Sequence, residues 1–272
     1  MTHYKILLFI AFFCPLLTFG QGKVLTILHT NDTHSQIEPW SDKKMKNVGG
    51  YARRDSVIRA AKENETPLLV VDAGDFSQGT PYFNFFGGYA EIEMMNLMGY
   101  EVATLGNHEF DNGVDALSRR LQTAQFHIVC ANYEFKHKKL SKQVKPYVVL
   151  KKDDLKIGVY GLLVDLRGLV DQKTIDSTTY KDPIAVSKEI VPFLRNKKKC
   201  DLIICLSHLG FEDNPKWVSD STLALAVGDI DIVVGGHTHR LLEDKVVNGV
   251  QIVQLEYGGM RIGKIDIRRK RK

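Results

Sequence analysis

The stretch "GNHEFDNG", residues 106–113, follows the apolar run "VATL" at 102–105 and places an amide, an imidazole and two carboxylates between glycines. Taken alone, it is compatible with a turn in which Asp111 caps a helix beginning near Val114. The same side chains, however, can hold metal ions and transfer protons. Which interpretation applies depends on what the rest of the chain brings to the same place.

The first twenty residues have the pattern of a secretory signal peptide. A short basic start, "MTHYK", precedes the apolar run "ILLFIAFFCPLL", and the small residues of "TFG" stand before Gln21. The run is too short for a transmembrane span. Lipid attachment at Cys14 is disfavoured because "AFFC" lacks small residues before the cysteine. We expect cleavage after residue 20, a periplasmic or secreted product, and no membrane span.

Residues 21–272 are long enough for one large α/β domain, and no repeat or linker-like stretch divides them. The formal net charge of +5 is mild and identifies no partner. The basic run "RRKRK" at 268–272 is typical of a solvated tail, so we expect no nucleic-acid partner. Cys130, Cys200 and Cys205 remain after cleavage, which does not indicate a disulfide framework.

Apolar, β-rich runs alternate with helical patterns along the chain. Strands are predicted at 24–30, 68–73, 102–106, 127–132, 155–163, 201–207 and 231–236, and the runs at 251–256 and 262–267 are predicted to form a closing antiparallel pair. Helices are predicted at 50–63, 89–98, 113–125 and 182–197. This β-α-β succession predicts an α/β layered sandwich.

Polar side chains follow five of the predicted strands. They are Asp32 and His34 in "HTNDTH", Asp75 in "DAGD", Asn107, His108 and Asp111 in "GNHEFD", His208 in "LSHLG", and His237 and His239 in "GGHTH". Each segment alone is compatible with a turn or a buried histidine. Because α/β sheets place ligands at the carboxyl ends of their strands, the five together indicate a shared site.

The combination of carboxylates, imidazoles and one amide, without cysteine, favours Zn²⁺, Mn²⁺ or Fe ions. In an extended segment, the two-residue spacings Asp32/His34 and His237/His239 would turn both side chains in one direction. Seven candidate ligands are too many for one ion. We therefore expect two divalent transition-metal ions that share a carboxylate and hold a bridging hydroxide for in-line attack on phosphorus.

The ordered motifs D-x-H, G-D, G-N-H-E, a later His and G-H-x-H resemble the calcineurin-like metallophosphoesterases. The segments "ILHTNDTH", "VVDAGDFSQGTP", "GNHEFDNG", "SHLG", "GGHTH" and "GGYAR" are similar to the catalytic domain of the 5′-nucleotidase and UDP-sugar hydrolase branch. This resemblance implies a fold of two mixed sheets flanked by helices and an enzyme that hydrolyses phosphoric esters, most closely 5′-nucleotides. It covers almost the whole of residues 21–272.

The resemblance also implies roles for individual residues. Asp32, His34 and His239 would hold the first metal, Asp75 would bridge, and Asn107, His208 and His237 would complete the second. His108 would assist the departing oxygen while Asp111 orients it, and Asn107 and His108 would contact the phosphate. Glu109 is expected to be structural, and His29 to pack beneath the site.

The chain departs from that branch in two ways. Ser35 stands where the branch often has glycine after D-x-H. The second, nucleoside-binding domain of the branch is not expected here, which leaves base binding to a separate polypeptide or to the chain's own loops, such as "FNFFGGY" at 83–89. The alternatives are a cyclic-nucleotide phosphodiesterase, another ester hydrolase on the same scaffold, or a non-catalytic metal-binding subunit of a split nucleotidase. The intact pair of His108 and Asp111 argues against the last.

Overall fold

A computed structural model of the chain describes residues 23–268 except 42, 44, 66 and 213–217. The expected signal peptide at 1–20 and the end of the basic tail lie outside these residues. None of the helices in the described part has the length and apolar character needed to cross a bilayer.

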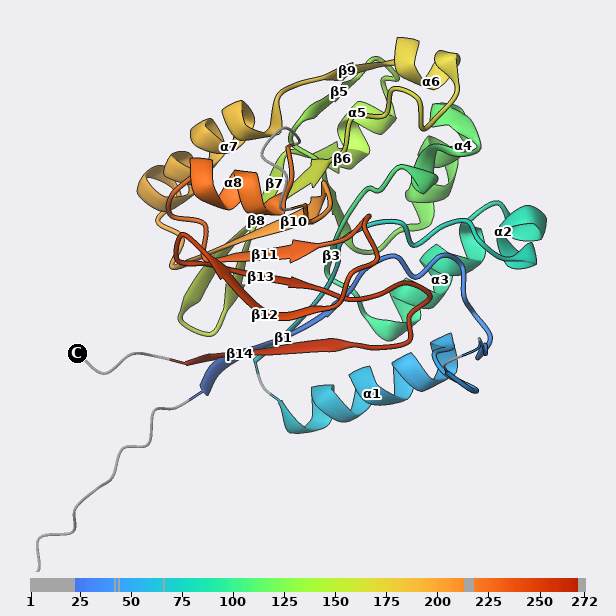
Figure 1. The fold of residues 1–272 in the computed structure, drawn as a ribbon, viewed down its shortest axis with the longest axis horizontal. Helices are drawn as coiled ribbons and strands as arrows, with labels where there is room; N and C mark the ends of the chain where they lie inside the picture. Colours follow the sequence, from blue (N-terminus) through green and yellow to red (C-terminus); the bar gives the residue numbers. More distant parts are fainter. Residues whose placement is uncertain (1–22, 42, 44, 66, 213–217, 269–272) are drawn as a thin grey trace, which may run out of the picture.

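Two six-stranded mixed sheets form the centre of the molecule (Figure 1). In spatial order, the first contains β14 (Gly263–Arg268), β1 (Lys23–Thr30), β2 (Leu68–Asp72), β3 (Val102–Thr104), β4 (His127–Val129) and β6 (Val144–Lys145). The second contains β12 (Leu242–Val247), β13 (Val250–Gln254), β11 (Ile232–Gly235), β10 (Leu202–His208), β8 (Leu155–Leu163) and β7 (Tyr147–Lys152). A separate pair joins β5 (Tyr133–Phe135) to β9 (Thr178–Tyr180).

Most neighbouring strands are parallel, and the antiparallel pairs lie at the sheet edges: β14 with β1, β12 with β13, and β7 with β8. The helices are α1 (Tyr51–Asn64), α2 (Pro81–Phe86), α3 (Tyr89–Met98), α4 (Gly113–Arg120), α5 (Leu140–Gln143), α6 (Gln172–Asp176), α7 (Pro183–Pro192) and α8 (Asp220–Ala226). Short helical turns occur at η1 (His108–Phe110), η2 (Leu121–Thr123) and η3 (Phe193–Lys197).

The central strands are apolar on both faces, since they are covered on both sides. In β1, Leu25 and Ile27 face the second sheet, whereas Leu28 belongs to the cluster shared with the helices α1, α3 and α4. A third cluster joins the second sheet to α7 and α8, for example through Val191 and Leu223. The layers are therefore helix, sheet, sheet and helix, which confirms the expected sandwich.

The prediction for the last two strands was wrong in its pairing. The strands exist, but β13 pairs with β11 and β12 in the second sheet, whereas β14 pairs with β1 in the first. The connecting segment 255–262 crosses between the sheets instead of forming a hairpin. Three strands at the sheet edges, β6, β7 and β12, and the separate pair of β5 and β9 were also absent from the prediction. Charged pairs, Lys151–Lys152 in β7 and Glu243–Asp244 in β12, weaken the apolar pattern of a strand.

Both sheets end on the same side of the molecule. The carboxyl ends of β1, β2 and β3 from the first sheet lie beside those of β10 and β11 from the second. There the sheets approach closely: a Cβ at Gly161 of β8 would lie 2.2 Å from the carbonyl oxygen of Val129 at the end of β4. The five polar segments therefore converge on one edge, although they come from two sheets and not from one.

Candidate metal centre

The predicted ligands gather in groups of side chains that could each hold an ion. Three such groups have all their ligand atoms within 4.8 Å of one another: Asp32 with His34 and His239, His34 with Asp75 and His108, and Asp75 with His208 and His237. Since His34 and Asp75 each belong to two groups, the three form one continuous cluster. The structure therefore brings these seven side chains together.

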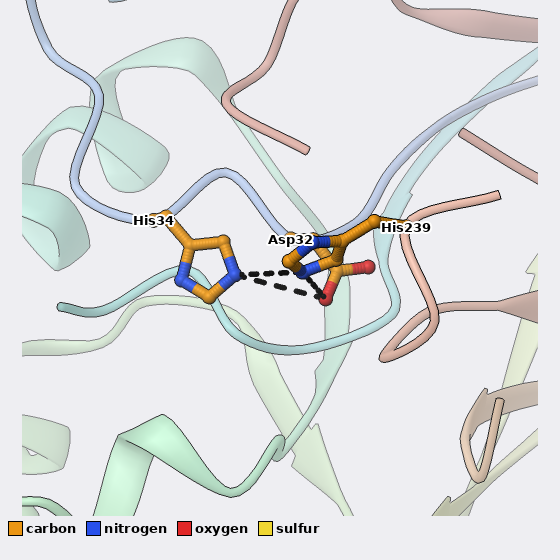
Figure 2. A group of neighbouring side chains, drawn as sticks. All are labelled: Asp32, His34 and His239. Atoms are coloured by element: carbon orange, nitrogen blue, oxygen red, sulfur yellow. Dashed lines mark hydrogen bonds and ion pairs between the residues drawn. The ribbon is translucent and has the colours of Figure 1, made fainter. Parts of the chain in front are cut away.

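Figure 2 shows Asp32, His34 and His239 pointing toward one another from two loops, the first two residues from the loop after β1 and His239 from the loop after β11. Nε2 of His34 lies 3.1 Å from Nε2 of His239, and the latter lies 3.4 Å from Oδ1 of Asp32. The carboxylate of Asp32 is fully buried and accepts hydrogen bonds from the backbone N–H of His237, 3.0 Å from each oxygen. The loops after β1 and β11 are thereby held together at this carboxylate.

Asp75 lies at the centre of the cluster. Its Oδ2 is 3.0 Å from Nε2 of His208 and 3.9 Å from Nε2 of His34. Its Oδ1 accepts the backbone N–H of His108 at 2.9 Å. The carboxylate thus has one oxygen directed at the imidazoles and the other anchored to the "GNHEF" turn, which is the placement that a bridging ligand would need.

Two buried polar atoms test whether the site fits a metal. Oδ1 of Asn107 has no hydrogen-bond partner among the described residues, and Nε2 of His208 makes no hydrogen bond of suitable geometry there, although it lies 3.0 Å from Oδ2 of Asp75. Nδ1 of His208 donates to the carbonyl of Ala73 at 2.7 Å, which directs Nε2 at the cluster, where loss of its proton would expose a lone pair to an ion. An unsatisfied buried polar atom costs about 1–3 kcal/mol. An ion would satisfy both atoms, and a set of oxygen and imidazole donors suits Zn²⁺, Mn²⁺ or Fe.

The charges within the cluster compensate one another. Burial opposes the charged forms of both Asp75 and His208, but their mutual attraction prevails, so the pKa of Asp75 falls below its usual range and that of His208 rises to about 10. Burial instead lowers the pKa of His237 to about 4, which keeps this imidazole neutral. A neutral imidazole is the form that binds a metal.

His108 and Asp111 form a pair at the rim. Nδ1 of His108 lies 2.9 Å from Oδ2 of Asp111, and both side chains are partly exposed, at 34% and 26%. The hydrogen bond to Asp111 is the main cause that raises the pKa of His108. The ring of His108 also lies 5.3 Å from that of His34. The imidazole of His108 therefore faces the cluster from the side open to solvent, with Asp111 favouring its charged form.

The backbone of the ligand loops is left-handed, which the sequence did not reveal. The φ angles are 47° at Asp32, 48° at His34, 53° at Asp75, 74° at His237 and 51° at His239. The assumption of extended segments was therefore wrong for both two-residue spacings, although the side chains do converge. Ser35 has a φ of 52°, which explains why glycine suits this position in similar proteins.

Glu109 has a larger part in the site than the sequence indicated. Its buried carboxylate accepts the backbone N–H groups of Asp75 at 2.9 Å, Ser77 at 3.0 Å and Gly106 at 2.6 Å. It therefore ties the loop after β2 to the loop after β3. His29, by contrast, lies against Gly263 of β14 and joins none of the ligand groups in the described part of the chain.

Comparisons with known proteins agree with this geometry. The chain is 30% identical to the trifunctional nucleotide phosphoesterase protein YfkN of Bacillus subtilis, over 89% of its own length and 18% of that protein. It is 34% identical to the snake venom 5′-nucleotidase of Gloydius brevicauda, over 85% of its own length and 40% of that enzyme. The chain thus spans less than half the length of either relative.

A solved 5′-nucleotidase precursor from Thermus thermophilus has the same fold. It superposes with a TM-score of 0.78 at 31% identity, covering 88% of this chain and 50% of that one. The sequence profile of the calcineurin-like phosphoesterases matches residues 25–241, which include all seven predicted metal ligands. The chain therefore belongs to the calcineurin-like phosphoesterase family.

Proposed function

We propose that this protein is a metal-dependent phosphoric ester hydrolase of the 5′-nucleotidase type. The observation that carries the proposal is the continuous cluster of carboxylates and imidazoles, with the His108–Asp111 pair at its open side. The printed names of the relatives, a nucleotide phosphoesterase and 5′-nucleotidases, support a nucleotide substrate. A subunit that only binds metal would have no need of the His108–Asp111 pair.

In this proposal Asp32, His34 and His239 would hold one ion, Asn107, His208 and His237 would hold the second, and Asp75 would be shared between them. The grouping follows the distances within the cluster and gives partners to the two unsatisfied atoms of Asn107 and His208. When bound, two such ions supply a water nucleophile of lowered pKa and neutralise charge on the phosphate. Glu109 contributes indirectly, because it holds the backbone on either side of the bridging position.

His108 is assigned to the departing oxygen. Its hydrogen bond to Asp111 engages Nδ1, leaves Nε2 for the substrate, and raises the pKa, which favours the protonated form that a general acid needs. Asp111 both orients the ring and stabilises its charge. We also assign contacts with the phosphate oxygens to Asn107 and His108.

The test of the function is a substrate screen with the purified protein. We expect hydrolysis of nucleoside 5′-monophosphates, loss of activity on chelation, and its return with Zn²⁺, Mn²⁺ or Fe²⁺. The same screen contains UDP-sugars, cyclic nucleotides and bis-nitrophenyl phosphate. Exclusive turnover of the cyclic or diester substrates would replace the proposal with a phosphodiesterase, and no turnover of any ester in the metal-loaded protein would refute it.

The role of His108 is tested by the leaving group. We expect His108→Asn to reduce kcat on alkyl phosphates by about 10²–10⁴-fold and on nitrophenyl phosphates much less, because nitrophenolate departs without a proton. Asp111→Asn should show a weaker form of the same difference, and both variants should retain the metal content of the wild type. Equal losses on the two substrate types would assign His108 to phosphate positioning instead.

We further propose export, with residues 1–20 removed as a signal peptide and residues 21–272 forming the catalytic domain. The proposal rests on the charged, apolar and small-residue segments of the first twenty residues. N-terminal sequencing of the protein from the periplasm or medium should begin at or near Gln21. Active protein found only in the cytosol with Met1 or Thr2 at its start would contradict it.

A further inference from the structure

The segment "GGYAR" at 49–53 joins none of the ligand groups in the described part of the chain, although it is one of the motifs that indicated the family. It forms the start of α1, where Gly50 holds the N-cap position with a φ of 88°. No side chain caps this helix, and its first turn contains no acidic residue. The first N–H groups of a helix carry partial positive charge, so an amino end of this kind suits an anion.

A cavity of about 260 Å³ lies beside this helix end. Gly49 and Gly50 line one part of it, and Gly259 and Ile262, from the segment that crosses between the sheets, line another. Since one water occupies about 30 Å³ of the liquid, the cavity has room for an ion of four oxygens. The described lining residues include no proposed metal ligand, no carboxylate and three arginines: Arg53, Arg54 and Arg261. This cavity is therefore distinct from the metal centre.

Arg54 is the buried member of the three arginines. It is 3% exposed, and its Nε and Nη2 have no hydrogen-bond partner among the described residues. These two nitrogens form one edge of the guanidinium, and such an edge binds a carboxylate or a phosphate through two parallel hydrogen bonds. Because arginine keeps its charge, two unused donors on a buried guanidinium are unfavourable unless an anion accepts from them.

The position of the Arg54 guanidinium is fixed by its neighbours. Its Cζ lies 4.5 Å from the ring centroid of Tyr51, and Nη2 lies against Gly259, where a Cβ would overlap that nitrogen. Burial opposes the charge of the guanidinium, but Tyr100, Tyr51 and Asp72 favour it, and its pKa is raised. Since Gly259 also lines the cavity, the unpartnered edge of Arg54 lies on the cavity side of the guanidinium.

The other two arginines are exposed and add charge at the mouth of the cavity. Arg53 donates to the carbonyl of Asn47 and, at 3.0 Å, to its Oδ1. These bonds hold Arg53 without neutralising it, because Asn47 carries no charge. Nε of Arg261 donates to Oε2 of Glu256 at 3.0 Å, which compensates the charge of that arginine. The cavity thus combines a buried guanidinium that has two open donors with an exposed one at the helix end.

We propose that this cavity is a second anion site, which binds a tetrahedral oxyanion between the open edge of Arg54 and the amino end of α1. The ligand is free phosphate or the phosphate of a monoester. The inference goes beyond the proposed hydrolase activity and does not depend on it, because the residues that line the cavity are not those of the metal centre.

Both walls of the cavity are bonded to the loop that carries the first metal ligands. The N–H of Gly258 donates to the carbonyl of Asp32 at 2.7 Å, and the N–H of Tyr51 donates to the carbonyl of Ile37 at 2.8 Å. An anion that joins the two walls would therefore hold this loop against both α1 and the crossing segment.

The test is a calorimetric titration of the metal-loaded protein with inorganic phosphate. We expect two binding events in the wild type, one at the metal centre and one in the cavity. Arg54→Met should weaken the cavity event by at least about tenfold, the expected effect of losing two charge-assisted hydrogen bonds, and should leave the other event within about twofold. Arg54→Lys should restore the cavity event only in part, because an ammonium has no two-donor edge. Arg53→Gln, at the surface, should weaken it by a smaller factor.

The matched control is Arg59→Met. Arg59 lies on the same helix, but its side chain is 66% exposed and its Nε is 2.6 Å from Oδ2 of Asp55. It should change neither event. A cavity event that Arg54→Met leaves unchanged, or that Arg59→Met weakens equally, would overturn the second site. A single event that is lost in Arg54→Met would keep the second site and reject phosphate binding at the metal centre.

Methylphosphonate separates the two sources of the ligand, since an esterase does not cleave its carbon–phosphorus bond. A cavity for the phosphate of a monoester should bind it within about twofold of inorganic phosphate, whereas a cavity for free phosphate should bind it at least about tenfold more weakly, because a methyl group replaces one hydrogen-bonding oxygen.

A second measurement applies even if Arg54→Met does not fold. Crystals of the metal-loaded wild type are soaked in selenate, a tetrahedral oxyanion with an anomalous signal. We expect a selenium peak between the guanidinium of Arg54 and the amino end of α1 at Gly50. The absence of a peak there, with or without peaks at the metal centre, would overturn the second site.

Discussion

The site depends on a left-handed backbone at five of the seven proposed ligands. For a residue with a Cβ, this conformation costs roughly 1–2 kcal/mol. Asp32, His34, Asp75, His237 and His239 all adopt it, with φ between 47° and 74°. The sharp turn at each of these residues brings its side chain over the end of its sheet. Such strain persists only where the surrounding structure determines the conformation.

Hydrogen bonds between the loops hold the backbone in this left-handed conformation. The N–H of Asp32 donates to the carbonyl of Gly74 at 2.9 Å, and that of His34 to the carbonyl of Asp75 at 3.0 Å. Glu109 fixes the opposite side of the same loop through three backbone N–H groups. Gly74 allows the close approach, because a Cβ there would lie 2.7 Å from the nitrogen of Gly106 and 2.9 Å from Nδ1 of His208. The ligands are thus placed by the loops around them and by the rigid double sheet beneath.

Much of this arrangement is predictable from sequence because polar residues after apolar runs mark the ends of strands. Asp75 comes shortly after the apolar strand "LLVVD", and His237 comes shortly after "IVVG". Both residues could therefore be assigned to strand ends from the sequence. Strand pairing is less accessible: the runs that became β13 and β14 have the same pattern whether they pair with each other or join different sheets. The link between Glu109 and Asp75, and that between Trp40 and Gly258, join residues 34 and 218 positions apart. A local sequence pattern does not predict hydrogen bonds between residues so far apart in the chain.

The central proposal is that the cluster around Asp75 would hold two ions. It is tested most directly by diffraction from metal-loaded crystals, with data collected on both sides of the absorption edge of the metal. The account predicts two anomalous peaks about 3.5–4 Å apart, with the Asp75 carboxylate between them. One should lie against His34 and His239, the other against Asn107, His208 and His237. A single peak in fully active protein, or two peaks with Asp75 bound to only one, would contradict the shared-carboxylate centre.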